Sequence, residues 1–292
     1  MKNLIRTSLC VVATLLVANG SVAQNNIKEV KPQNEKSLLW EISGKGIEKP
    51  SYLYGTVHAI CGDDFLVKER VTKAFEKTSK LALEINMDDA QEMSDMQKAA
   101  LGIMPLSKKL TSEESTELNE ILEKTAGMKL NQVDNFTMAT IMSLIAIKSF
   151  GCTNLKSYEM EFVTKAKAAN KTIVGLEKVK AQLDFLNNAY TDQEMIAMLK
   201  ELNIEETKKM VQYYIQEDIS NLYLNVTDKK VMNEKTKSFM LDQRNNNWVS
   251  FMPEMMKKES VFFAVGAGHL AGEEGVINLL KKAGYTVKPI LN

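Results

Sequence analysis

The sequence predicts an α/β protein whose central mixed β-sheet is built from N- and C-terminal βαβ units and carries a large helical insertion. Short runs rich in aromatic and β-branched residues, the composition of buried strands, occur toward both ends of the chain. At each end these runs alternate with segments of helical spacing. The stretches around residues 87–157 and 190–258 have a mostly helical pattern instead. We therefore expect a single domain over residues 37–292 in which the two ends of the chain share one sheet.

Residues 1–23 have the pattern of a secretory signal peptide. Two basic residues, Lys2 and Arg6, precede an apolar core, and a small-x-small cleavage motif ends at Ala23. The apolar core is too short to favour a membrane span, and no later segment is apolar enough to form one. The polar residues 24–36 are expected to be a flexible lead-in. The sequence thus predicts an exported protein, periplasmic or secreted, with no transmembrane segment after signal cleavage.

In chain order, the strand-like segments are those with alternating or continuous apolar residues between turn signals. They cover residues 37–43, 51–58, 80–86, 171–176, 260–265 and 285–290. In the third of them, residues 81, 83 and 85 are apolar and share one face, so Glu84 points to the other face. Glycine and proline between the first two strands mark the turn that joins them.

Helical segments are those in which apolar residues recur at three- and four-residue spacing. They cover residues 65–78, 112–125, 132–150, 158–170, 179–189 and 273–283. The charge-rich segment 191–257 is also predicted to be helical, with candidate N-cap residues at Thr191 and Thr227. A strand, a helix and a second strand close the chain, which predicts a compact C-terminal βαβ unit.

The chain has two histidines, and both end the same local pattern. His58 ends Y-L-Y-G-T-V-H and His269 ends V-F-F-A-V-G-A-G-H, each after a predicted strand and each in the motif G-x-x-H. Histidine titrates closest to neutrality and is the commonest metal ligand. Gly55 and Gly266 lack a Cβ and so allow a close approach of backbone or ligand. The matched contexts favour one shared site; the alternative is that each histidine is a packed residue at a strand end.

Acidic residues follow further predicted strands. In α/β sheets, ligands collect beyond the carboxyl ends of the strands, where four candidates would lie: His58, Glu84, Glu177 and His269. Imidazole and carboxylate together suit Zn²⁺, Mn²⁺ or Co²⁺, and a metal with an open position activates water. A glutamate could instead orient an imidazole as a general base without a metal. The residue types alone leave both chemistries open.

Arginine is scarce once the signal peptide is removed. Only Arg70 and Arg244 remain, against many lysines, so lysine serves the surface of this protein. Arginine differs from lysine in being planar, always charged and able to bind in a bidentate way. Arg244, in the sequence D-Q-R-N, is therefore a candidate to clamp a carboxylate or stabilise an oxyanion. The alternative is an ordinary surface or helix-pairing arginine.

Charge and cysteine usage exclude several classes of protein. The chain has 37 basic and 37 acidic residues, and cleavage after residue 23 removes two of the basic ones, leaving a net charge of −2. This balance argues against a nucleic-acid partner. Cys61 and Cys152 remain after the signal peptide, and an exported chain commonly joins two such cysteines; free buried thiols are the alternative. Neither lies in a C-x-x-C motif, so no thioredoxin-like or zinc-knuckle site is indicated.

Taken in order, these blocks resemble the TraB/GumN family, which is related to the Tiki-type membrane proteases. The likeness covers nearly the whole mature chain, in Y-L-Y-G-T-V-H, L-A-L-E-I, Y-E-M-E-F, V-G-L-E, D-Q-R-N and V-G-A-G-H-L-A-G-E-E-G. The resemblance implies an active centre made of the two G-x-x-H motifs, a strand-borne glutamate and an arginine. These correspond to His58, Glu84, Arg244 and His269, with Glu161 and Glu177 as further acidic candidates.

The resemblance also implies a hydrolase, because Tiki proteins are described as divalent-metal-dependent proteases. We expect Mn²⁺, Co²⁺ or Zn²⁺ held between His58 and His269, with Glu84 as a further ligand or as the base. Water would hydrolyse a peptide bond whose carbonyl is polarised or anchored by Arg244. Related groups imply two alternatives: a non-catalytic protein that binds haem, metal or a peptide, and a metal-independent esterase. The identity of the substrate, a peptide or a small molecule, and the oligomeric state are left open by the sequence.

Overall fold

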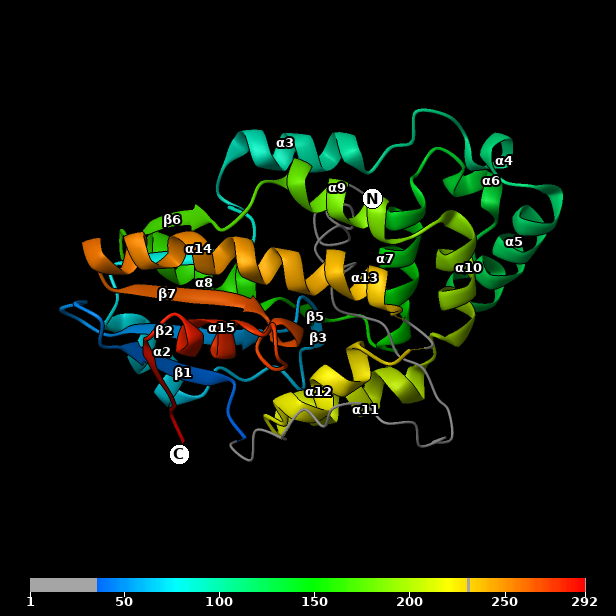
Figure 1. The fold of residues 1–292 in the computed structure, drawn as a ribbon. Helices are drawn as coiled ribbons and strands as arrows, with labels where there is room; N and C mark the ends of the chain where they lie inside the picture. The colour runs from blue at the N-terminus through cyan, green and yellow to red at the C-terminus, as the bar shows by residue number, and fades with distance from the viewer. Residues whose placement is uncertain (1–35, 230–231, 292) are drawn as a thin grey trace.

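The computed structural model describes residues 36–229 and 232–291. Within them, a six-stranded mixed β-sheet lies at one end of the molecule (Figure 1), with its strands in the order β6-β4-β7-β2-β1-β8. The strands are β1 Leu39–Ser43, β2 Ser51–Thr56, β4 Lys80–Leu83, β6 Thr172–Gly175, β7 Val261–Gly266 and β8 Thr286–Pro289. The predicted signal peptide and residues 24–35 of the predicted lead-in lie outside the described residues.

The sheet confirms the predicted α/β class and shows how the two ends of the chain combine. Strands β2, β7, β4 and β6 are parallel, whereas β1 is antiparallel to both β2 and β8. The units β2-α2-β4 and β7-α15-β8 are both βαβ crossovers, with α2 at Glu69–Glu76 and α15 at Val276–Lys282. However, β7 lies between β2 and β4, while β2 and β1 lie between β7 and β8. The two terminal units are therefore interleaved rather than set side by side as two half-sheets.

The central strands are buried throughout, and their sequences explain why. All six residues of β2 and all six residues of β7 are buried. Near-continuous apolar runs of this kind are typical of parallel strands whose two faces are both covered. The register pairs Leu53 with Phe263 and Thr56 with Gly266. As a result, the two G-x-x-H segments leave the sheet next to each other and in the same direction.

The remaining helices fill the segments where helical spacing predicts them. They are α3 Ala90–Ala99, α4 Leu106–Lys109, α5 Ser112–Ala126, α6 Leu130–Val133, α7 Met138–Ser149, α8 Tyr158–Ala168, α9 Val179–Ala189, α10 Asp192–Glu201, α11 Ile204–Ile215, α12 Ile219–Val226, α13 Glu234–Lys237 and α14 Gln243–Lys258. Helices α4 to α7 and α10 lie together on the right of Figure 1, away from the sheet. None of the helices within the described ranges is long and apolar enough to cross a membrane.

Capping residues set several of the helix boundaries. The predicted helix at residues 132–150 is divided, because Thr137 caps the start of α7 by accepting a backbone N–H bond. The predicted N-cap Thr191 is confirmed, since it forms a capping box with Glu194 at the start of α10. The prediction for Thr227 is wrong: this residue is the C-cap of α12, and its hydroxyl donates to a backbone carbonyl one turn earlier.

A second, two-stranded sheet lies next to the first histidine segment. Strand β3 (Ile60–Cys61) pairs antiparallel with β5 (Leu155–Lys156). Cys61 and Cys152 form a disulfide, so the pairing alternative of the sequence analysis is confirmed and the free-thiol alternative is wrong. The bond connects the chain just after His58 to the segment that follows α7.

Gly55 lies where β2 contacts the turn after β7, and the close contact leaves no room for a side chain. A Cβ at this position would lie 2.6 Å from Leu270 Cδ1 and 3.2 Å from Ala267 Cα. We expect Gly55→Ala to lower the free energy of unfolding by about 1–3 kcal/mol, the usual cost of overpacking a core. Urea denaturation measures this loss, with Gly268→Ala as a milder control because its Cβ would first meet the Val226 side chain at 3.2 Å. Equal stability of Gly55→Ala and wild type would contradict the packing argument.

Candidate active site

Four side chains selected from the sequence follow the carboxyl ends of the parallel strands. His58 comes after β2, Glu84 after β4, Glu177 after β6 and His269 after β7. Because the four strands are parallel neighbours, their carboxyl ends form one edge of the sheet. The ladder between β4 and β6 continues past both strands, where the Glu177 N–H donates to the Glu84 carbonyl at 2.9 Å. The structure therefore brings these four residues to a common edge.

His58 is paired with a carboxylate that the sequence analysis did not select, Glu159. His58 Nδ1 lies 2.9 Å from Glu159 Oε1, and Thr56 Oγ1 donates to the same oxygen at 2.5 Å. Ser157 Oγ donates to the other carboxylate oxygen at 2.9 Å. The His58 side chain is only 6% exposed, and its Nε2 has no hydrogen-bond partner among the described residues. One ring nitrogen is thus held by a carboxylate, and the other is buried without a hydrogen-bond partner among the described residues.

Glu159 reaches His58 from the first turn of α8. Ser157 caps this helix by accepting the N–H of Met160, which fixes where the helix begins. The buried face of α8 includes Phe162 and Val163, three and four residues after Glu159. Residues at these spacings share one face of a helix, so Glu159 is directed inward with them.

Glu161, the acidic candidate in the same block, does not join the site. Its side chain is 39% exposed and pairs with Lys165, one turn further along α8, at 3.5 Å. Positions 161 and 165 lie off the face that carries Phe162 and Val163. The apolar spacing within this helix is the sequence signal that distinguishes Glu159 from Glu161.

The pKa values of the His58–Glu159 pair are set by burial and by their mutual charge. Burial lowers the pKa of His58, but the charge of Glu159 and the hydrogen bond to it raise the pKa above the ordinary value of 6.5. Burial raises the pKa of Glu159, whereas the charge of His58 and hydrogen bonds from His58 and Thr56 bring it below its ordinary value. His58 is therefore a better proton acceptor than a free histidine.

Arg244 is fully buried, and protein groups occupy all five of its N–H donors. Nε donates to Glu177 Oε1 at 3.0 Å, and Nη2 donates to Glu84 Oε2 and Glu177 Oε1, each at 2.6 Å. Nη1 donates to the Met240 carbonyl at 3.1 Å and to His269 Nε2 at 3.2 Å. No donor is left for a substrate carbonyl in this arrangement. The expectation that Arg244 polarises or anchors that carbonyl does not fit the geometry.

The position of Arg244 depends on a π-helical turn, Ser238–Asp242, directly before α14. Such a turn adds one residue to the helical register and is frequent at functional sites. Arg244 and Trp248 are both buried on α14, with the guanidinium carbon 5.0 Å from the indole ring centre. Trp248 Nε1 also donates to Glu177 Oε2 at 3.3 Å. The helix thus supplies both the buried cation and the aromatic face beside it.

His269 is held as a neutral imidazole. Its Nδ1–H donates to Asn245 Oδ1 at 2.7 Å, and its Nε2 accepts from Arg244. Asn245 donates from Nδ2 to the Glu274 carbonyl at 2.7 Å, which fixes the orientation of its amide. Burial and the positive charge of Arg244 lower the pKa of His269 to about 3. Unlike His58, this histidine has both ring nitrogens engaged.

Glu84 and Glu177 share the single cation of Arg244. Glu84 Oε1 accepts from the Gly266 N–H at 2.7 Å, which gives the glycine of the second motif a direct contact with the site. Burial raises the pKa of Glu84, but Arg244 and the two histidines lower it to about 2. Burial raises the pKa of Glu177 above its ordinary value, and the like charge of Glu84 adds to the increase. Glu84 is therefore the more firmly ionised of the two.

The predicted metal ligands His58, Glu84 and His269 do not fit a metal site in this arrangement. A ligating imidazole needs a free nitrogen, whereas both nitrogens of His269 are engaged. Glu84 is already bound to the guanidinium of Arg244, whose charge would repel a second cation between the same groups. Within the described residues, no group of three histidine, cysteine, aspartate or glutamate side chains is arranged to hold a metal ion.

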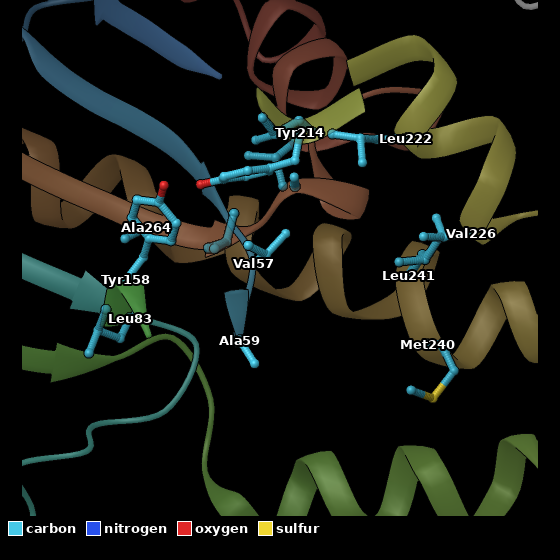
Figure 2. Close-up of a cluster of buried hydrophobic side chains, with 14 of the residues drawn as sticks. Val57, Ala59, Leu83, Tyr158, Tyr214, Leu222, Val226, Met240, Leu241 and Ala264 are labelled. Atoms are coloured by element: carbon cyan, nitrogen blue, oxygen red, sulfur yellow. The ribbon is translucent and has the colours of Figure 1, made fainter. Parts of the chain in front are cut away.

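Buried apolar residues flank the polar residues of the site in the sequence. Figure 2 shows Val57 and Ala59, which flank His58 in sequence, in one buried hydrophobic cluster with Leu83 and Met240. Leu83 precedes Glu84, and Met240 lies in the π-helical turn before Arg244. Charges act on one another more strongly in such low-dielectric surroundings.

Comparison with known proteins gives two findings. The sequence model of the TraB/PrgY/gumN family matches residues 38–289 of this chain. Among curated proteins, Metalloprotease TIKI1 of Xenopus tropicalis is 22% identical over 90% of this chain and 63% of its own length. The proteins of the same name from Danio rerio and Homo sapiens are 22% and 21% identical over 88% and 96% of this chain, and 64% and 68% of their own lengths. The chain thus spans about two thirds of the length of these relatives. No solved structure gives a significant match.

Replacing Glu159 tests the origin of the His58 pKa. In Glu159→Gln the burial of His58 remains while the neighbouring charge is lost, so we expect its pKa to fall below 6.5. NMR titration of the imidazole resonances measures this directly, because the second histidine has a pKa of about 3 and does not titrate in the same range. Glu161→Gln, on the exposed face of the same helix, is the matched control and should leave the titration unchanged. An unaltered His58 pKa in Glu159→Gln would contradict the assigned pairing.

Proposed function

Because the chain belongs to the TraB/PrgY/gumN family, we propose that it is a hydrolase that cleaves peptide bonds, with His58 as the general base. The observation that carries the proposal is the state of His58: Nδ1 is held 2.9 Å from Glu159, and the buried Nε2 has no hydrogen-bond partner among the described residues. With the Nδ1 proton held by Glu159, the Nε2 lone pair is free to accept a proton from a water molecule. The name of the curated relatives, Metalloprotease TIKI1, supports a peptide as the substrate.

The proposed reaction begins with water at His58 Nε2. The water oxygen attacks the carbonyl carbon of the peptide bond while its proton passes to Nε2, giving a tetrahedral intermediate and an imidazolium. Glu159, hydrogen-bonded to Nδ1, stabilises this imidazolium and keeps the ring oriented. When the C–N bond breaks, the proton on Nε2 passes to the leaving amine nitrogen. The raised pKa of His58 favours the first transfer.

In this proposal Arg244, Glu84 and His269 do not react with the substrate; they support the reaction through their contacts with one another and through their charge. The guanidinium fixes Glu84 and His269 in place, and the charge of Glu84 contributes to the raised pKa of His58. Truncating one partner of such a buried charge network leaves an uncompensated charge and is strongly destabilising. We therefore assign Arg244 to positioning and buried charge balance, and His269 to the same network.

We also propose that the protein is exported. The Cys61–Cys152 disulfide supports this, because disulfides persist mainly in oxidising compartments outside the cytosol. The pattern of residues 1–23 supports it from the sequence side. An extracytoplasmic peptide is thus the proposed substrate class.

Replacing His58 tests the proposal most simply. We expect His58→Gln to reduce the hydrolysis of a fluorogenic peptide library by about 10²- to 10⁴-fold, the usual contribution of a general base. The thermal transition should change little, because glutamine can still donate to Glu159 and the lost Nε2 makes no hydrogen bond. Glu161→Gln serves as the active control. Unchanged hydrolysis in His58→Gln would contradict the proposal, and stoichiometric peptide binding without turnover by the wild type would favour the non-catalytic alternative.

The same assay decides the question of a metal. With His58 as the base, wild-type turnover should survive exhaustive chelation, because neither Glu84 nor His269 is free to bind an ion in this arrangement. Loss of turnover on chelation, restored by Mn²⁺, Co²⁺ or Zn²⁺, would contradict the metal-free base. Turnover of aryl esters but not of peptides would instead favour the esterase alternative.

A further inference from the structure

The two members of the His58–Glu159 pair flank the same end of the small β3–β5 sheet, one next to each strand. His58 precedes Ile60, the first residue of β3, by two positions, and Glu159 follows Lys156, the last residue of β5, by three. Ile60 pairs with Lys156 across the ladder. The spacing between His58 and Glu159 therefore depends on how these two strands are held together.

The other end of the same ladder is closed by a covalent bond. Cys61 pairs with Leu155, the Gly62 N–H donates to the Asn154 carbonyl at 2.7 Å, and Cys61 is joined to Cys152 by the disulfide. From the His58–Glu159 pair to the disulfide, the connection runs through two ladder pairs and one further backbone hydrogen bond. At the Glu159 end, the connection includes the first turn of α8, which begins two residues after β5.

A ladder of this length is weak without the bond. Two-stranded sheets are marginal in water, and this one has only two residues in each strand. Its strands are far apart in the chain, with the two cysteines 91 positions apart, so no short turn fixes their register. Beyond the ladder, Glu159 bonds to Thr56 and His58, and the neighbouring Tyr158 hydroxyl bonds to the Leu66 N–H and carbonyl at 3.2 and 3.0 Å. The disulfide is thus the one covalent restraint on the register of β3 and β5 within the described residues.

We propose that the Cys61–Cys152 disulfide is a positioning element of the site, which keeps β5 in register with β3 and so holds Glu159 against His58. This inference rests on the proposed function only in giving that contact a catalytic purpose; the contact itself can be observed without any activity. Neither cysteine acts on a substrate. The bond acts through the two strands, on the orientation of the base.

The test uses the full chain and follows the His58 Nδ1 proton by ¹⁵N–¹H NMR of the imidazoles. With two histidines in the chain, the spectrum is simple to assign. In the double variant Cys61→Ser/Cys152→Ser, we expect the His58 Nδ1–H signal to broaden or to lose its hydrogen-bonded shift. The His269 Nδ1–H signal should persist as an internal control, because its acceptor Asn245 lies on α14, which is not part of the β3–β5 ladder. Asp63→Asn, a neighbouring exposed substitution, is the matched control and should change neither signal.

Peptide turnover is the second readout. We expect it to fall about 10- to 100-fold in the double variant, the scale of loss that a misplacement of about 1 Å can cause. An unchanged His58 signal in a folded double variant would overturn the positioning role, whatever its activity.

If the double variant does not fold, the same measurement is made on the wild type after its disulfide is reduced by a phosphine in a stabilising osmolyte. Selective loss of the His58 signal, restored on reoxidation, would support the proposal. If the reduced wild type also unfolds, the disulfide contributes to stability alone, and the proposed positioning role is overturned.

The two hypotheses fail in different ways. If His58→Gln retains activity, the proposed function is wrong, while the NMR comparison still reports whether the disulfide holds the pair. If His58→Gln is inactive and the His58 signal is indifferent to the disulfide, the function stands and the positioning role is wrong.

Discussion

The parallel pairing of β2 with β7 is the constraint on which the rest of the site depends. It joins strands from the first and last thirds of the chain and brings the segments with His58 and His269 to one edge of the sheet. The same edge receives Glu84 and Glu177 from the neighbouring strands. Buried carboxylates need compensating charge, and Arg244 of α14 supplies it. The fold therefore fixes which acids meet, and a single guanidinium makes their burial tolerable.

The histidines of the two G-x-x-H motifs have pKa values that are shifted in opposite directions. Both imidazoles are buried, and burial lowers the pKa of each. At His58 the ionised partner Glu159 reverses that effect, whereas at His269 the nearest strong charge is the cation of Arg244, which adds to it. One histidine thus has a raised pKa and the other is a neutral hydrogen-bonding residue. The difference in pKa arises from the charged neighbour of each ring, Glu159 at His58 and Arg244 at His269, and not from the motif itself.

Much of the fold and part of the site could be predicted from the sequence, for reasons visible in particular residues. Continuous apolar runs marked the central strands, and the matched G-x-x-H segments pointed to the edge where the four strand-end residues meet. The family resemblance points to Glu161, whereas the apolar residues Phe162 and Val163 place Glu159 on the inward face of the same helix. The donors of Arg244 could not be counted in advance, since they depend on the π-helical turn and on distant carboxylates. The interleaving of the two βαβ units was equally hidden, because strand order depends on pairing between the chain ends and no local pattern encodes it.

The central claim is that His58, oriented by Glu159, takes the proton of the attacking water. The pH dependence of kcat/KM for peptide hydrolysis tests it most directly, since this parameter reports the essential groups of the free enzyme. The account predicts that kcat/KM falls about tenfold per pH unit on the acid side, below an apparent pKa higher than the 6.5 of an ordinary histidine. Activity that stays constant down to the titration range of a carboxylate would contradict it.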